Sequence, residues 1–340
     1  MEKLRFGILG AARIAPAAIV KPARQIPGVE VVAVAARDRT RAEEFAKKHE
    51  IPRVVDDYAA LIADPDIDAI YNPLPNGLHA EWTEKALAAG KHVLCEKPFT
   101  SNLAEAERVA AVAAETQLVV MEAFHYRYHP VAERMREIAR SGELGELQRV
   151  ETFMCVPLPM PRDIRYRYDL AGGATMDVGC YATHMNRLVA GGEPEVVSAK
   201  ARLVKPDVDY AMHAELRYSD TLTATMTCAL YPGPTALAKA AAGRQLLKIR
   251  VRVTGDRGSL SVFNPTGPQF GYRMTVRTDG QKRRVKVDGA KKPTYSYQLE
   301  AFTNAVLRGG PVLTPPTDSV ANMRVIDAIY EAAGLPVRGT

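Results

Sequence analysis

Short apolar segments alternate with helical patterns along the first third of the chain, and this alternation limits how the chain can fold. Segments typical of strands cover residues 4–9, 29–35, 69–72, 93–95 and 118–121. Helical patterns follow them over residues 16–25, 40–49, 58–63, 79–89 and 103–116. Strands and helices that alternate through short links wind into a parallel sheet with helices on both faces. The pattern therefore predicts an α/β fold that begins with a doubly wound, Rossmann-type sheet.

The second part of the chain has a different character. After a helical pattern over residues 131–141, strand-like segments dominate, at 148–154, 196–204, 212–218, 222–230, 249–254, 259–263 and 274–287. Because few helical patterns separate them, we expect a large antiparallel or mixed sheet, closed by a last helix over residues 318–333. A chain of 340 residues is long enough for two domains. We predict a boundary between residues 1–123 and residues 124–340.

Composition excludes several classes of protein. Apolar residues make up 47% and charged residues 25%, close to the average of soluble globular proteins. The charged start of the chain enters an apolar strand at once and no long apolar run follows, so we expect neither a signal peptide nor membrane association, and a cytoplasmic location. Four widely spaced cysteines are expected to be buried thiols and not disulfides or zinc ligands: Cys95, Cys155, Cys180 and Cys228.

Two further features could suggest binding sites, and we interpret both as structural. The net charge is +6, and basic residues gather over residues 282–292. They follow an alternating segment around Asp279-Gly280, a pattern typical of an exposed hairpin, so we expect no nucleic-acid binding. His125 and His129 are four residues apart, but Pro130 follows directly and no carboxylate or cysteine completes a ligand set. We expect no metal site.

The first strand runs directly into a turn of small residues before a helix begins. Free backbone amides and the helix dipole make such a turn a site for a phosphate anion. The segment from Gly10 to Ala15 matches the G-x-G-x-x-A form of the dinucleotide fingerprint, with Ala12 in place of the middle glycine. The alternative interpretation is a helix cap whose small residues allow close packing.

The end of the second strand carries the chemistry that would distinguish NAD from NADP. An acidic residue there would bind the ribose hydroxyl of NAD, but the expected contact position holds Ala36. Arg37 follows, and a guanidinium suits a 2′-phosphate, so the segment favours NADP. Asp38, one residue further on, keeps NAD as the alternative.

The stretch Gly90 to Pro98, GKHVLCEKP, ends in an ionisable pair. Its apolar run predicts a buried strand, and Pro98 interrupts the ladder of sheet hydrogen bonds just after Glu96 and Lys97. In a doubly wound sheet the ligand crevice lies at the carboxyl ends of the strands. We therefore expect Lys97 to face a ligand site.

These motifs, in this order, resemble the glucose-fructose oxidoreductase and inositol dehydrogenase (Gfo/Idh/MocA) family. The resemblance rests on the first turn, the Pro75-Asn76 loop with His79, the GKHVLCEKP stretch and the segment GGATMDVGCY from Gly172 to Tyr181. It spans nearly the whole chain and is strongest to the dihydrodiol dehydrogenase and NADP-linked sugar dehydrogenase branch. It implies that residues 1–123 form a dinucleotide-binding Rossmann domain. It also implies that residues 124–340 form a second α/β domain with an open-faced sheet, which binds the substrate and mediates oligomerisation to a homodimer or homotetramer.

The resemblance also implies roles for individual residues. Lys97 matches the catalytic lysine of the family and Asp177 its substrate-site aspartate. Tyr181 matches a position that is histidine in inositol dehydrogenases and tyrosine in the glucose-fructose and dihydrodiol branch. We expect cofactor contacts from Gly10, Ala12, Arg13, Ile14, Arg37, Leu74, Asn76, His79, Glu96, Lys97 and Arg127.

The residues themselves suit hydride transfer to or from a nicotinamide. Oxidation of a secondary alcohol needs a base for the hydroxyl proton, and Tyr181 can be that base if Lys97 stabilises its phenolate. Asp177 lies four residues before Tyr181 and would share its helix face. The alternative is a helix on which Tyr181 only packs. Residues that could line a sugar, polyol or diol pocket are Arg162, Arg165, Tyr166, Tyr168 and, as a second proton carrier, His184.

Two other functions remain open from sequence alone. One is a regulatory protein that binds the dinucleotide and a sugar without turnover. The other is an enzyme that couples two sugars through a cofactor that is never released.

Overall fold

The computed structural model describes residues 3–160, 162–231, 238 and 247–339. By its internal contacts the chain forms two compact units, the first made of Met1–Tyr128 and Thr294–Val320, the second of His129–Pro293 and Ala321–Thr340. The segment 294–320 belongs by contacts with the first unit, whereas the sequence placed it in the second domain. The roles of the two predicted domains, dinucleotide binding in the first and substrate binding and oligomerisation in the second, stay predictions.

The first unit contains a six-stranded parallel sheet in the order β3-β2-β1-β4-β5-β6. Its strands are β1 (Leu4–Leu9), β2 (Val29–Ala35), β3 (Arg53–Val55), β4 (Ala69–Asn72), β5 (His92–Cys95) and β6 (Val120–Glu122). The strand order reverses between β1 and β4, so the loops after these two strands form the topological switch point at which doubly wound folds bind ligands. The predicted Rossmann-type sheet is confirmed.

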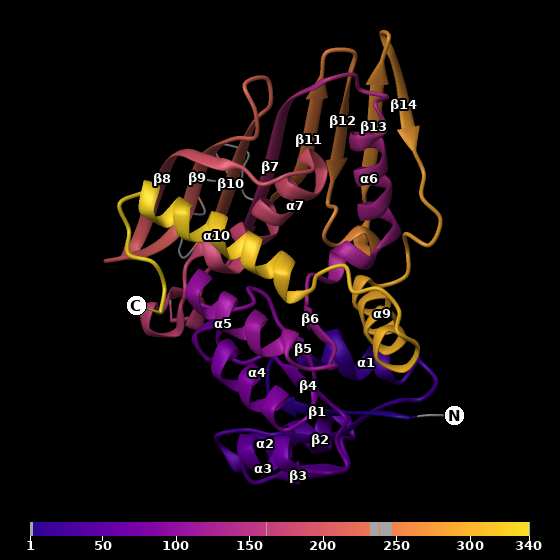
Figure 1. The fold of residues 1–340 in the computed structure, drawn as a ribbon, viewed down its shortest axis with the longest axis vertical. Coiled ribbons are helices and arrows are strands. Elements are labelled where there is room, and N and C mark those ends of the chain that lie inside the picture. The colour runs from indigo at the N-terminus through magenta and orange to yellow at the C-terminus, as the bar shows by residue number, and fades with distance from the viewer. Residues whose placement is uncertain (1–2, 161, 232–237, 239–246, 340) are drawn as a thin grey trace. The chain divides into compact units, whose positions relative to one another are not determined.

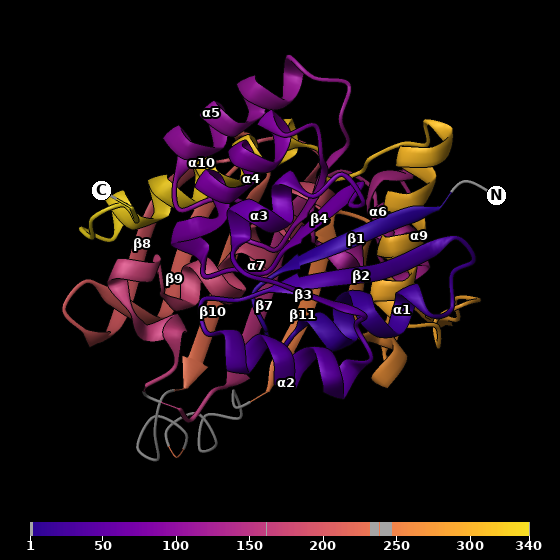
Figure 2. The ribbon, with the colours of Figure 1, turned by 90° about the horizontal axis from the view of Figure 1, so that it is seen from below.

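Helices cover both faces of this sheet, as Figure 2 shows. One face carries α3 (Tyr58–Ala63), α4 (His79–Ala88) and α5 (Leu103–Ala114), and the other carries α1 (Lys21–Ala23) and α2 (Arg39–His49). Asn102 caps α5, since its side chain accepts a hydrogen bond from the backbone of Glu105 at 2.9 Å.

One helix of the first unit was not expected from the sequence. This helix, α9 (Thr294–Arg308), packs against α1 and sends Leu299 and Phe302 into the core of the unit. Its buried positions also include Ser296 and Gln298, so its buried side is not marked by apolar residues alone. Its apolar residues nevertheless follow the i, i+4, i+7, i+11 spacing of an amphipathic helix, so the signal was present in the sequence and was missed: Tyr295, Leu299, Phe302 and Val306.

The second unit contains an eight-stranded mixed sheet in the order β14-β13-β12-β11-β7-β10-β9-β8. Its strands are β7 (Leu147–Pro157), β8 (Glu195–Lys205), β9 (Val208–Arg217), β10 (Thr223–Tyr231), β11 (Lys248–Gly255), β12 (Gly258–Phe263), β13 (Arg273–Thr278) and β14 (Gln281–Val285). Among the described strands of this sheet, only β10 and β7 pair in parallel. The large, mainly antiparallel sheet is confirmed, as is the hairpin whose turn is Asp279-Gly280.

Helices α6 (Pro130–Arg140) and α7 (Cys180–Ala190) lie over one face of this sheet (Figure 1). Strand residues on the helix side are buried, for example Val251 and Val253 of β11. Short 3-10 helices are found at Asn76–Leu78, His125–Tyr128, Ile164–Tyr166, Tyr168–Leu170 and Pro268–Phe270. The last helix, α10 (Pro316–Ala332), contributes residues to both units.

Two helical segments begin with a π turn. These turns, Pro16–Val20 and Thr175–Gly179, close through i to i+5 hydrogen bonds, from Lys21 N–H to Pro16 O and from Cys180 N–H to Thr175 O. π turns inside helices occur frequently at functional sites. Both follow the glycine-containing segments that the sequence singled out, although nothing in the hydrophobic pattern predicted them.

The cysteines are as expected from the sequence. All four cysteines are free thiols and buried. Within residues 3–160, 162–231, 238 and 247–339, no group of three or more histidine, cysteine or carboxylate side chains could hold a metal ion. No helix in that same part of the chain is long and apolar enough to cross a membrane.

Candidate functional site

The turn after β1 approaches the loop after β4 closely. Gly10 has a φ of +87°, and a Cβ atom there would lie 3.2 Å from Leu74 Cδ2. Gly10 N–H donates to Ala35 O at 2.6 Å and Ala12 N–H donates to Gly10 O at 2.9 Å, which fixes the turn between two strand ends. The left-handed backbone and the close approach explain the glycine. A bare backbone at a switch point fits a bound pyrophosphate.

Two arginines gather at the carboxyl end of β2. Arg37 is exposed and directly follows the buried Ala36, and Arg41 reaches back from α2 to donate to Ala11 O at 3.3 Å. Burial raises the pKa of Tyr58, against the charges of Arg37 and Arg41. The Tyr58 hydroxyl lies at the same turn, 3.7 Å from where a Cβ atom of residue 10 would be. Arg41 and Tyr58 were missed from sequence, because only the fold brings α2 and α3 to this turn.

The acid that would have favoured NAD has a structural role. Asp38 is the N-cap of α2, and its carboxylate accepts a hydrogen bond from Arg41 N–H at 3.1 Å. An N-cap carboxylate satisfies a backbone donor and stabilises the helix dipole. The ribose end of the candidate dinucleotide site is therefore basic.

His79 fixes two of the loops expected to hold the cofactor. Its Nε2 lies 2.7 Å from Leu74 O and its Nδ1 lies 2.7 Å from Pro98 O. The imidazole is buried, and burial lowers its pKa to about 4, although both carbonyl contacts oppose that shift. Because both nitrogens face main-chain carbonyls, His79 positions the loops, which differs from the direct cofactor contact expected from the sequence.

The pair after β5 is held from the neighbouring strand and from its own turn. Tyr71 OH on β4 donates to Glu96 Oε1 at 2.8 Å, and Glu96 Oε2 accepts from Lys97 N–H at 3.3 Å. Beyond the cis peptide bond between Lys97 and Pro98, Phe99 N–H donates to the buried Glu122 carboxylate at 3.0 Å. These bonds fix the backbone on both sides of the half-buried Lys97.

In the second unit, Arg165 joins two carboxylates. Its guanidinium lies 3.0 Å from Asp177 and 3.0 Å from the buried Asp163. The charge of Asp177, with that of Asp163, raises the pKa of Arg165 against the effect of burial. The sequence had proposed Asp177 and Arg165 separately. The structure brings them together as a donor and acceptor pair suited to hydroxyl groups.

Tyr181 lies in the first turn of α7, directly after the π turn that carries Asp177. Its side chain is 5% exposed, and that of His184, one turn further on, is 4% exposed. Asp177 and Tyr181 are four residues apart across this π turn, and their shared helix face stays a prediction. Both residues lie in one continuous helical segment, formed by the π turn and the start of α7.

Two of the remaining predicted residues, Tyr166 and Tyr168, each donate a hydrogen bond to a main-chain carbonyl, and the others are described by their exposure. Tyr166 is fully buried and donates to Leu158 O at 3.0 Å, which is a packing role and does not fit a pocket lining. The side chain of Tyr168 donates to Val337 O at 3.3 Å. Exposed or partly exposed residues are Arg13, Ile14, Asn76, Arg127 and Arg162.

The fold and the turn of the first unit define a dinucleotide-binding protein. Residues 4–124 match the model described as "Oxidoreductase family, NAD-binding Rossmann fold", and residues 132–261 match the GFO/IDH/MocA C-terminal domain. The chain belongs to the Gfo/Idh/MocA family of oxidoreductases, as its motifs indicated. It is an NAD(P)-dependent oxidoreductase.

Known proteins similar to this chain include sugar and diol dehydrogenases. D-xylose 1-dehydrogenase (NADP(+)) 2 of Haloferax volcanii is 38% identical over 333 residues, 97% of each chain. Trans-1,2-dihydrobenzene-1,2-diol dehydrogenase of Xenopus tropicalis is 29% identical over 97% of this chain and 96% of that protein. A solved structure of a 3-ketoreductase from Actinomadura kijaniata, in complex with NADP and TDP-benzene, has a TM-score of 0.84 and 29% identity, covering 97% and 98% of the two chains.

Proposed function

We propose that this protein transfers a hydride between NADP, in preference to NAD, and a secondary alcohol or lactol of a sugar, polyol or cyclic diol. The observation that carries the proposal is the basic character of the candidate site where the ribose would bind. Arg37 lies there, and the aspartate that follows it, Asp38, caps α2. The xylose dehydrogenase and the ketoreductase, whose descriptions name NADP, support the same choice of cofactor.

The first unit has residues that fit the dinucleotide. The Gly10 turn would hold the pyrophosphate, Arg37 and Arg41 the 2′-phosphate, and the loops anchored by His79 would border the cofactor. When bound, the nicotinamide supplies the hydride acceptor in oxidation or the hydride donor in reduction.

The chain's own residues would handle the proton. In oxidation the substrate carbon loses a hydride, its hydroxyl loses a proton, and a carbonyl forms. Tyr181 is proposed to take that proton at its phenolic oxygen and to return it in reduction. Lys97 is proposed to assist by favouring the phenolate and the developing negative charge on the reacting oxygen. Asp177 and Arg165 would orient the neighbouring hydroxyls of the substrate.

The proposal also includes an assembly. Helices cover one face of the eight-stranded sheet, and the residues on its other face include Arg250, Arg252 and Phe263. We propose that the enzyme is a homodimer or homotetramer, and that it acts in the cytoplasm. Its partners are then small molecules and a second copy of the chain, with no nucleic acid or membrane involved.

The test is turnover by a Tyr181→Phe variant. We expect kcat to fall by about 10²- to 10⁴-fold, since this is what a positioned acid or base contributes. Tyr218→Phe is the control, because the Tyr218 hydroxyl is also buried in the second unit and has no hydrogen-bond partner there among the described residues. A Tyr181→Phe variant with near wild-type turnover would falsify the assignment.

The substrate is found with a panel of aldoses, inositols and dihydrodiols, monitored by nicotinamide absorbance with NADP and with NAD. Turnover of at least one of these, faster with NADP, is the expected result. Tight nucleotide binding without any redox change would instead support the regulatory protein. Cofactor retained through purification, with turnover only when two sugars are present, would support the enzyme that couples two sugars.

A further inference from the structure

A fully buried ion pair lies in the second unit, and neither of its members was singled out from the sequence. Arg338, which follows α10, donates to Asp209 Oδ1 of β9 at 3.1 Å, and both side chains are 0% exposed. Tyr330 OH donates to the same oxygen at 3.0 Å. The Arg338 guanidinium lies over the Tyr330 ring, 4.1 Å from its centroid. We call this group, Asp209 with Arg338 and Tyr330, the Asp209 clamp.

The clamp uses its remaining hydrogen bonds on the segment that leads to the candidate site. Asp209 Oδ2 accepts from both the backbone N–H and the hydroxyl of Thr175, each at 2.8 Å. Arg338 Nε donates to Gly172 O at 2.8 Å. Burying two charges is costly unless the pair is fully hydrogen-bonded. Here part of that hydrogen bonding comes from Thr175 and from the carbonyl of Gly172, and Arg338 Nη1 also donates to Pro336 O at 3.1 Å.

The glycine pair in this segment follows from the clamp. Gly173 has a φ of +139°, and a Cβ there would lie 2.2 Å from Asp209 Oδ1 and 2.7 Å from Tyr330 OH. A Cβ at Gly172 would lie 2.6 Å from Arg167 O. No side chain fits at either position, since the clamp and the preceding loop both touch the backbone directly.

Main-chain bonds connect the clamped segment to the candidate catalytic residues. Asp177 N–H donates to Gly173 O at 3.0 Å, and Gly173 N–H donates to Arg165 O at 2.8 Å. Cys180 N–H closes the π turn onto Thr175 O, one residue before Tyr181. The clamp therefore contacts the start of the π turn. The main-chain bonds just described connect that start to Asp177, Arg165 and Tyr181.

We propose that Arg338 is a positioning residue, which acts through Asp209 to hold the π turn and so sets the placement of Asp177 and Tyr181. This inference rests on the proposed function of those two residues. Arg338 touches no reacting atom. Its effect is on the rate of the step that needs Tyr181 in place, and not on binding of the nucleotide by the first unit.

The experiment compares Arg338→Met with Arg187→Met in the full-length enzyme. Arg187, on α7 itself, is also mostly buried and ion-paired, with Glu193 at 2.6 Å, but it lies at the other end of the helix. We expect Arg338→Met to lower kcat by about 10²-fold, the effect of misplacing a reacting group by about 1 Å. The KM for NADP should stay within about twofold, and Arg187→Met should leave kcat unchanged.

Amide hydrogen exchange, measured without substrate, gives a second readout. In Arg338→Met the Asp177 and Cys180 amides should exchange at least about tenfold faster than in wild type and in Arg187→Met. If neither kcat nor exchange over residues 175–181 differs from the control, the clamp is not a positioning device. If the wild-type protein turns over no substrate, the proposed function fails. The exchange result then still tests whether the clamp holds the π turn.

Milder variants keep the proposal testable if Arg338→Met does not fold. Arg338→Lys keeps the charge and one donor to Asp209 but loses the bond to Gly172 O, so part of kcat should return. Tyr330→Phe removes a single bond to Asp209 Oδ1. We expect kcat to fall in the order wild type, Tyr330→Phe, Arg338→Lys, and equal kcat in all three would overturn the proposal.

Discussion

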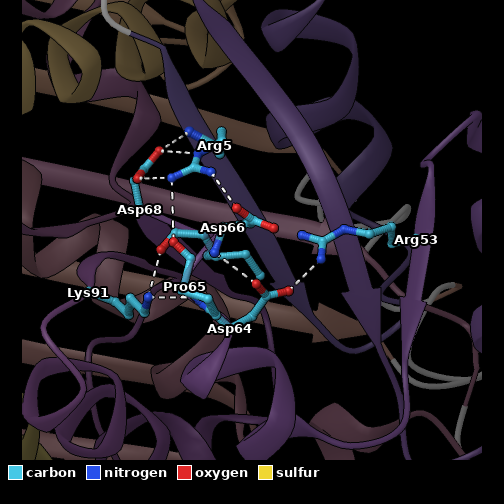
Figure 3. A network of polar contacts seen from close by, with 8 residues as sticks. Arg5, Arg53, Asp64, Pro65, Asp66, Asp68 and Lys91 are labelled. Carbon is cyan, nitrogen blue, oxygen red and sulfur yellow. Dashed lines mark hydrogen bonds and ion pairs between the residues drawn. The ribbon is translucent and has the colours of Figure 1, made fainter.

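Polar side chains are used differently at the two ends of the strands of the six-stranded sheet. We call the side on which the strands start the amino edge, and the side on which they end the carboxyl edge. At the amino edge, Arg5 at the start of β1 donates to Asp68 Oδ2 and Oδ1, at 3.0 and 2.9 Å, and to Asp66 Oδ1 at 3.1 Å (Figure 3). Arg53 at the start of β3 pairs with Asp64 at 2.7 Å. Ion pairs therefore join the starts of the strands, and Arg5 and Lys91 also donate to main-chain carbonyls of residues 64–67.

At the carboxyl edge, side chains bond mainly to loop backbone. His79 contacts two carbonyls, the Glu122 carboxylate accepts from Phe99 N–H, and Arg41 donates to Ala11 O. These contacts fix loop conformations next to the Gly10 turn and Lys97. The amino edge therefore secures the fold, whereas the carboxyl edge shapes the site, and substitutions at the two edges should affect different measurements.

Strand β5 gives the sharpest form of this comparison, because a lysine stands at each of its ends. Lys97 follows it at the carboxyl edge, and Lys91 precedes it at the amino edge, where its ammonium donates to Asp64 O at 2.8 Å and Ile67 O at 2.7 Å. We expect Lys97→Met to lower kcat by about 10²- to 10⁴-fold with little change in Tm.

Lys91→Met is the matched control and should behave in the opposite way. It removes one donor from each of two main-chain carbonyls, although Asp64 O still accepts from Ile67 N–H at 3.2 Å. We expect it to destabilise the protein by about 1–3 kcal/mol while kcat stays near wild type. The measurements are steady-state kinetics and thermal unfolding of both variants. A large loss of kcat in Lys91→Met, or none in Lys97→Met, would contradict the division between the edges.

Cofactor choice provides a smaller effect at the carboxyl edge. Arg37→Ala should raise the KM for NADP by about 10- to 100-fold, since a charge-assisted contact to phosphate is lost, and should change the KM for NAD by less than about twofold. Arg39→Ala is the control, because Arg39 is exposed and pairs with Glu43 at 2.9 Å. An equal effect of Arg37→Ala on both cofactors would remove the argument for NADP.

The smallest expected effect is at the amino edge. Although burial opposes it, the hydrogen bonds and charge of Arg5 hold the pKa of Asp68 below its ordinary value of 3.8. We expect Asp68→Asn to lower the free energy of unfolding by about 1 kcal/mol at pH 7, because this pair is partly exposed, with kcat and KM unchanged.

The pH dependence of this difference has a definite sign. A carboxylate whose pKa is lowered by folding stabilises the protein above its unfolded pKa, and that stabilisation is lost as the pH falls through the folded value. The difference between wild type and Asp68→Asn should therefore be constant from about pH 5 to 7 and shrink below about pH 4. Urea unfolding at several pH values measures it, and a difference that grows in acid would contradict the role assigned to Asp68.

The sequence by itself determined much of the first unit. Strands β1, β2 and β4 and helix α3 lie at the expected residues, and the Gly10 turn and Lys97 lie at the carboxyl edge as the alternation predicted. Local rules were enough here because each element is marked by its own apolar period, cap or turn residue. The strands of the mixed sheet were found for the same reason.

Only the tertiary structure decided how the polar groups of the candidate site are held. The two π turns, the contact of Arg41 with Ala11, and the pair of Arg338 with Asp209 leave no periodic trace in the sequence. Each depends on residues far apart in the chain, or on a buried polar face whose partners are known only after folding. The pattern of apolar residues specifies which segments become buried, but hydrogen bonds between distant buried groups are specified by the packing that brings them together.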